Sequence, residues 1–204
     1  MRVDRIAICM ISLAIASSGL ASSPALSSAQ QDDVSDGRWW TRHSSNERGD
    51  FVAGWMNCYY FDHRGPFLWA SDISMDSVVN LLSHYYESDS ARLSASLSHA
   101  ILAVASLRDG VSTLPSAVRP PEDRGWDGLD WKQMSGGEQL AYVEGYMQCH
   151  QSFAFTVPHV RFARTPGDYV RRTSMWYRFD RQTGDIDGDR ESTSIGAVLH
   201  RVAH

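Results

Sequence analysis

The chain has 204 residues, of which 43% are hydrophobic and 21% are charged, which suffices for one globular domain or two small ones. The formal net charge is −5 and the pI is about 5.9. Since no basic run or basic-aromatic stripe occurs, the composition argues against nucleic acid as a partner.

The N-terminus has the pattern of a secretory signal. A short basic start precedes a nearly continuous apolar run over residues 6–16, and small residues follow up to Ala21 and Ala29, after either of which cleavage is expected. The apolar run is too short for a membrane span, and a buried N-terminal helix is the alternative interpretation. We therefore predict a signal peptide over residues 1–29 and a periplasmic or secreted protein with no membrane span after cleavage.

Export changes how the cysteines are interpreted. Cys9 would leave with the signal, and Cys58 and Cys149 would remain. An oxidising compartment favours pairing of an even number of cysteines, so we predict a Cys58–Cys149 disulfide rather than a catalytic thiol.

An internal repeat organises the rest of the chain. Residues 36–58 align with residues 127–149 without a gap, at an offset of 91, and nine of the 23 positions are identical. Unrelated stretches of ordinary composition would share about one or two. We predict two halves, residues 30–112 and 125–204, joined by a proline-containing linker over 113–124.

Each half begins its first helix at the same motif. The capping-box spacing Ser-x-x-Glu occurs at Ser44 and Glu47 and again at Ser135 and Glu138. In this motif the Ser side chain accepts from a free helix N–H group, and the Glu side chain accepts from the Ser N–H. The spacing predicts helices over about 45–61 and 136–153.

These two helices share a flat face. Gly54 and Cys58 lie four residues apart on the first helix, and Gly145 and Cys149 lie at the same places on the second. Because glycine has no side chain, it allows another backbone to approach closely. We expect the halves to pack about a pseudo-two-fold axis along this helix seam, with the disulfide on the axis.

Two further helices are predicted in each half. The second helix follows caps at Ser74 and Thr165, and the third covers Leu97 to Val104 in one half and Ile195 to Val202 in the other. The Asp-Gly pairs at 36–37 and 127–128 are expected to be turns that direct a Trp into the core. The fold class is therefore all-α, with two pseudo-symmetric three-helix repeats packed into one helical domain.

The repeated motif carries a resemblance. Asp-Gly-x-x-Trp-x-x-x-Ser-x-x-Glu-x-x-x-aromatic-Val-x-Gly-aromatic, followed by a capped helix that ends in aromatic-Tyr, resembles a unit of small exported bacterial proteins of unknown function. Those proteins usually carry one unit and more often have Gly in place of Cys58 and Cys149. More loosely, the chain is similar to periplasmic Tai-type immunity proteins, which block amidase effectors of type VI secretion, although it lacks their additional cysteines. That resemblance implies a small exported helical protein with a protein partner.

Glu47 and Glu138 have a second interpretation. One carboxylate from each half would form the pair that a glycosidase needs, and Trp40, Trp126 and Trp131 would line a sugar cleft. The capping boxes already explain both glutamates, and a repeated Trp is more typical of core packing. We interpret the glutamates as caps and keep the hydrolase as the alternative.

The strongest local acidic cluster lies in residues 184–191, where Asp185, Asp187 and Asp189 alternate. Carboxylate oxygens suit calcium, but no register of this loop matches the EF-hand template. A solvated turn is favoured, with the three aspartates as the candidate metal ligands. The eight histidines show no zinc-protease spacing and no Ser lies in Gly-x-Ser-x-Gly, so no cofactor is expected.

The leading hypothesis is an exported non-enzymatic binding or immunity-like protein, with a partner protein in the cell envelope. It rests on the export signal, on the repeat without a catalytic constellation, and on an aromatic-rich composition with 7 Trp, 8 Tyr and 7 Phe. The alternatives are an envelope glycan hydrolase that uses carboxylates such as Asp127, Glu138 or Asp187, and a purely structural envelope component.

Overall fold

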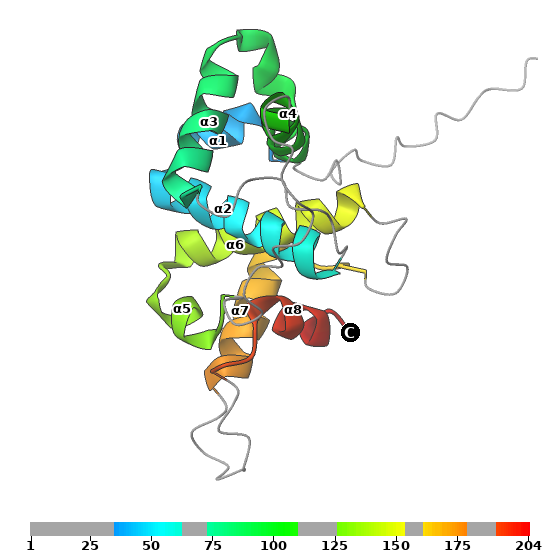
Figure 1. The fold of residues 1–204 in the computed structure, drawn as a ribbon. Helices are drawn as coiled ribbons and strands as arrows, with labels where there is room; N and C mark the ends of the chain where they lie inside the picture. Colours follow the sequence, from blue (N-terminus) through cyan, green and yellow to red (C-terminus); the bar gives the residue numbers. More distant parts are fainter. Residues whose placement is uncertain (1–34, 63–72, 110–125, 154–160, 179–190) are drawn as a thin grey trace, which may run out of the picture. The chain divides into compact units, whose positions relative to one another are not determined.

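The computed structural model describes residues 35–62, 73–109, 126–153, 161–178 and 191–204, all within one compact unit, Val34–His204. Within these ranges the chain is helical, and the only β feature is an isolated bridge between Asp36 and Ser96. The α-helices are α1 Gly37–Arg42, α2 Ser45–Asn57, α3 Met75–Glu87, α4 Leu97–Asp109, α5 Gly128–Gln133, α6 Gly136–Ser152, α7 Pro166–Arg178 and α8 Ile195–Ala203 (Figure 1). The prediction of an all-α fold is confirmed.

Several predictions fall on other parts of the chain. The signal peptide (1–29), the linker (113–124), and Asp185, Asp187 and Asp189 lie outside the described residues. Within the described ranges, no helix is both long and apolar enough to cross a membrane.

Helix starts recur through the two halves. α1 and α5, α2 and α6, and α3 and α7 begin 91 residues apart, whereas α4 and α8 begin 98 residues apart. Each half also has one short α-helix more than predicted, because the Asp-Gly pairs begin helices α1 and α5 and are not free turns. The Asp36 and Asp127 side chains accept hydrogen bonds from N–H groups of these helices, as N-caps do.

The short helix places a Trp in the core. Trp40 is 1% exposed and its indole N–H donates to the Ser83 hydroxyl on α3 over 3.1 Å. Gly37 lies under the Tyr86 ring, since a Cβ there would be 2.5 Å from the ring. The expectation that the repeated Trp packs inward therefore holds for the first half.

The same contacts recur in the second half. Trp131 is 1% exposed and donates to Ser174 on α7 over 3.0 Å, and Gly128 lies under the Tyr177 ring. With both indoles enclosed, neither Trp40 nor Trp131 is available to line a sugar cleft.

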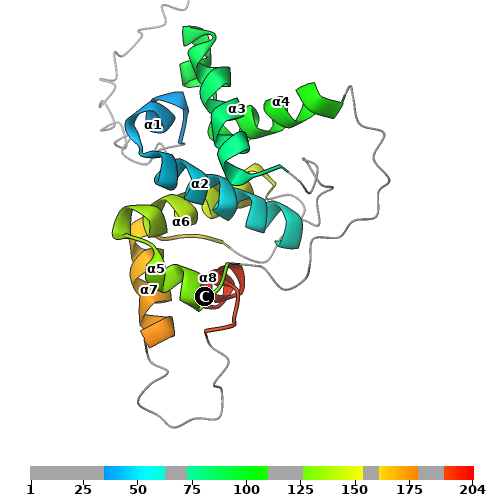
Figure 2. The same ribbon diagram turned by 60° about the vertical axis from the view of Figure 1, so that its left-hand side comes forward.

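α2 and α6 pack side by side at the centre of the described unit (Figures 1 and 2). Their central contact is reciprocal. A Cβ on Gly54 would overlap the Tyr142 carbonyl oxygen and lie 2.9 Å from its carbon. A Cβ on Gly145 would meet the Phe51 carbonyl in the same way. Because only glycine fits at these two places, they set how closely the helices approach.

The disulfide joins the C-terminal ends of this helix pair. Cys58 follows the last residue of α2, begins the π-helical turn Cys58–Asp62, and is bonded to Cys149 of α6, with Cα atoms 6.1 Å apart. Both cysteines are fully buried. Since Glu47 at the start of α2 also lies against Gly137 at the start of α6, the two helices run parallel.

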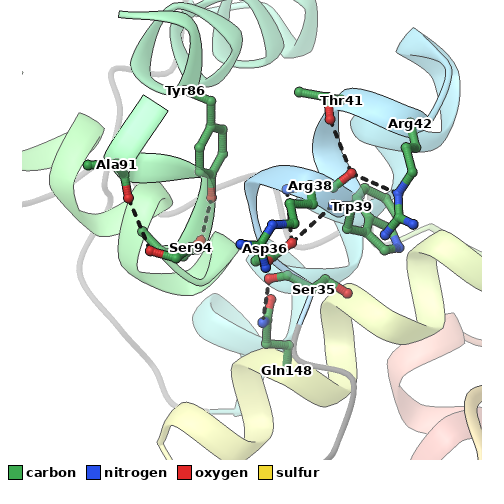
Figure 3. Close-up of polar contacts among 11 residues, drawn as sticks. Ser35, Asp36, Arg38, Trp39, Thr41, Arg42, Tyr86, Ala91, Ser94 and Gln148 are labelled. Atoms are coloured by element: carbon green, nitrogen blue, oxygen red, sulfur yellow. Dashed lines mark hydrogen bonds and ion pairs between the residues drawn. The ribbon is translucent and has the colours of Figure 1, made fainter. Parts of the chain in front are cut away.

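Polar bonds also tie α6 to the start of the first half. The Gln148 amide donates to the Ser35 carbonyl over 2.9 Å (Figure 3). The Trp39 indole N–H donates to Glu144 over 2.8 Å. These bonds hold Ser35 and α1 against α6.

The two cores differ in polarity. Tyr169 and Thr173 of α7 are fully buried, and their hydroxyls have no hydrogen-bond partner in the described part of the chain. At the positions 91 residues earlier, α3 has Val78 and Leu82. A buried hydroxyl without a partner costs stability, so the core of the second half is the less favourable of the two.

We predict that Gly54→Ala and Gly145→Ala each lower the free energy of unfolding by about 2–4 kcal/mol, because the methyl group meets backbone that cannot rotate away. Denaturant unfolding measures this loss. Gly49→Ala is the matched control on α2, since its Cβ would lie 3.7 Å from Met75 in ordinary contact. It should be neutral or stabilising by up to about 1 kcal/mol. Equal losses at Gly49 and Gly54 would contradict the close seam.

We predict that Cys58→Ser and Cys149→Ser lower the melting temperature equally, and that the double variant costs no more than either single one. The disulfide closes a loop between residues 91 apart, and its loss should cost about 2–4 kcal/mol. Thermal unfolding of the three variants gives the comparison. Additive losses would mean that the cysteines contribute separately.

Candidate functional site at the acidic end of the helix seam

The parallel course of α2 and α6 brings their two capping boxes to the same end. The Ser44 N–H and hydroxyl both donate to Glu47 Oε2 over 2.8 Å, and the Glu47 N–H donates to the Ser44 hydroxyl. The Ser135 N–H donates to Glu138 Oε2 over 2.6 Å in the same way. Both glutamates therefore act as the helix caps that the sequence predicts.

The caps also make contact across the seam. A Cβ on Gly137, at the start of α6, would overlap Glu47 Oε1, so the Glu47 side chain covers the first turn of the other helix. In return, the Asn46 side chain of α2 hydrogen-bonds to Glu138. Each carboxylate thus lies at the junction of both helices.

A third carboxyl group lies beneath these two. Asp50 follows Glu47 by one turn on α2 and is 7% exposed. Its carboxyl makes no hydrogen bond or ion pair with any described residue. At the position 91 residues later, α6 has a buried Ala141. The same position of the helix seam therefore carries a carboxyl group in the first half and a methyl group in the second. We call Glu47, Asp50 and Glu138 the acidic end.

The environment separates the pKa values of these three groups. Hydrogen bonds from Ser44 lower the pKa of Glu47, and hydrogen bonds from Ser135 and Asn46 lower that of Glu138. Burial, followed by the charges of Glu138 and Glu47, raises the pKa of Asp50 to about 7. At neutral pH two ionised carboxylates therefore lie beside one that is about half protonated.

Chemically, this arrangement attracts cations and holds a proton near neutrality. Two ionised carboxylates supply negative charge at the surface, and Asp50, which is 7% exposed, supplies a carboxyl group that makes no hydrogen bond to a described residue. Within the described residues, no group of three or more His, Cys, Asp or Glu side chains has the placement of a metal site. A group with several hydrogen-bond donors fits this chemistry better than a bare ion.

The other candidate residues from the sequence, Asp127 and Trp126, have structural roles. Asp127 caps α5 and forms a capping box with Asp130, so its carboxylate is engaged. Trp126 is half-buried and packs against the Tyr142 ring, with centroids 6.1 Å apart.

Sequence reasoning missed Asp50. The signal was present in the sequence. Asp50 immediately precedes Phe51, which lies on the predicted inner face of α2, and the residue 91 positions after Asp50 is Ala141. A charged residue at one position and Ala at the equivalent position indicates that the fold does not require the charge. The missing part was the burial of Asp50, which only the folded structure reveals.

In comparisons with known proteins, no family model, curated protein or solved structure matches the chain.

We predict that Asp50→Asn makes the protein more stable than the wild type at pH 8, by about 1–3 kcal/mol, and that this difference shrinks toward pH 4. The sign follows from the raised pKa of Asp50 in the folded state. Stability from this group is complete below the unfolded pKa and is lost as the pH rises through about 7. Urea unfolding at a series of pH values measures the difference.

The control is Glu87→Gln, at the exposed end of α3. That variant should show no gain that grows between pH 4 and pH 7. A constant difference between Asp50→Asn and the wild type across this range would show that Asp50 ionises normally.

Proposed function

We propose that this chain is an exported, non-enzymatic binding protein that engages a protein partner at the acidic end. One observation carries the proposal. Asp50 is 7% exposed and its carboxyl makes no hydrogen bond to a described residue, at a position where the other half of the helix seam packs with Ala141. A group that lowers stability and that the scaffold does not need is typical of a site retained for function.

The geometry favours binding over hydrolysis. Glu47 and Glu138 are engaged as caps, and Asp50 is 7% exposed beneath them, so a large glycan has little access to the proton that Asp50 holds. A protein side chain that is narrow and cationic is able to reach this depth. Electrostatic attraction to the two outer carboxylates would also speed the encounter with a basic partner.

Export is the second part of the proposal. It rests on the signal pattern at residues 1–29 and agrees with the Cys58–Cys149 disulfide, since disulfides persist in oxidising compartments. An immunity-like role, in which the chain covers a toxic enzyme of the envelope, is one form of this function, and the resemblance of the repeated motif supports it.

The hydrolase alternative gains one specific observation. A protonated Asp50 beside the ionised Glu47 and Glu138 is the pairing of acid and base that glycosidases use. A purely structural envelope component remains the third alternative.

The test is affinity capture of the tagged protein from the envelope fraction of its own host, with mass spectrometry of what is retained. The binding function predicts one stoichiometric protein partner. The double variant Glu47→Gln/Glu138→Gln should reduce the captured amount at least tenfold, while Glu87→Gln should not. Gln still serves in a capping box, so the double variant removes charge at little cost to the helices.

Salt gives a second readout, since capture through the partly exposed carboxylates of Glu47 and Glu138 should weaken as ionic strength rises. Equal capture by the wild type and the double variant would exclude the acidic end as the contact. Cleavage of envelope glycan by the wild type, abolished by Asp50→Asn in a folded protein, would establish the hydrolase.

A further inference from the structure

The acidic end has more acceptors than donors. The donors in the described structure are the Ser44 N–H and hydroxyl, the Ser135 N–H and the Asn46 amide, and all of them go to Glu47 or Glu138. None goes to Asp50, which is 7% exposed. The Asp50 carboxyl has no hydrogen bond from a described residue, and a ligand that supplies donors would provide one.

Charge alone does not choose between cations, but the placement of the acceptors does. Glu47 and Asp50 lie one turn apart on α2, and Glu138 comes from α6. The described side chains include no group of three that could hold a metal ion. A guanidinium has five N–H donors spread over a plane, which suits acceptors that come from two helices. The three donors of an ammonium group all lie on one nitrogen atom.

We propose that the acidic end receives an arginine side chain of the protein partner, whose guanidinium donates to Asp50 and to a carboxylate at the rim, and that Asp50 releases one proton as the guanidinium enters. The inference rests on the proposed binding function and names the chemistry of its partner. The proton leaves the Asp50 carboxyl for solvent, the guanidinium keeps its charge, and no covalent bond to the partner forms.

The charges that face Asp50 support this linkage. Glu47 on α2 and Glu138 on α6 both oppose its ionisation, and burial is the largest cause of its raised pKa, about 7. An entering cation reverses the balance, because an opposite charge within contact distance favours the ionised form. Binding and proton release are reciprocal, so partner affinity rises with pH by up to tenfold per pH unit below 7 and levels off above it.

The experiment is a ¹³C NMR titration of the Asp50 carboxyl in the full chain, with and without the peptide amide Gly-Arg-Gly. The expected result is that saturating peptide lowers the pKa of Asp50 by about 1 or more. The matched peptide with citrulline in place of arginine has a similar shape without the charge, and it should leave the titration unchanged. A lysine peptide should produce a smaller shift than the arginine peptide.

Variants separate this inference from general charge attraction. Asp50→Asn should weaken the arginine peptide at least tenfold and remove the rise of its affinity with pH, while Glu87→Gln should change neither. An unchanged Asp50 titration up to the solubility limit of the peptide would overturn the inference, as would equal shifts with arginine and citrulline.

The two proposals fail separately. A partner captured through Glu47 and Glu138 whose affinity does not vary between pH 5 and pH 8 would leave the binding function standing and overturn the arginine contact. An Asp50 shift with the peptide, but no captured partner, would support the contact and contradict the proposed function.

Discussion

The backbone contact between α2 and α6 at Gly54 and Gly145 is the constraint on which the rest of the structure depends. The two helices run parallel. Because each glycine lies against a carbonyl of the opposite helix, the distance between the helices is one that no larger residue permits. This single register brings Cys58 to Cys149 at one end and the two capping boxes together at the other. The disulfide and the acidic end are therefore two consequences of one packing contact.

Parallel packing also explains why the acidic end is costly. Both helices present their N-terminal ends there, and each capping box adds a carboxylate that suits its own helix dipole. Each cap is favourable by itself, yet together they place Glu47 and Glu138 near Asp50, whose ionisation they oppose. The two halves share their helices but differ at this position, where the first half has Asp50 and the second has Ala141. We propose that the function depends on Asp50.

Most of the fold can be predicted from the sequence. Ser44, Glu47, Ser135 and Glu138 predict helix starts because a capping box is a local interaction, and helical periodicity predicts the apolar faces for the same reason. The Asp-Gly pairs were interpreted as turns because Asp and Gly serve in both turns and caps, and only the packing of Tyr86 over Gly37 distinguishes them. Asp50 was missed since its raised pKa depends on burial in the folded protein and in part on Glu138 of α6, which lies 88 positions further along the chain. Local signals thus predict elements, while the site depends on contacts between them.

The most direct test of the central claim is the pKa of Asp50 in the free protein, measured by ¹³C NMR of its carboxyl group. If α2 and α6 enclose Asp50 between two ionised carboxylates, its midpoint lies near 7, well above that of an exposed aspartate. A midpoint near 4 would mean that the carboxyl group is solvated and free of its neighbours, and the acidic end would then have no special chemistry to offer a partner.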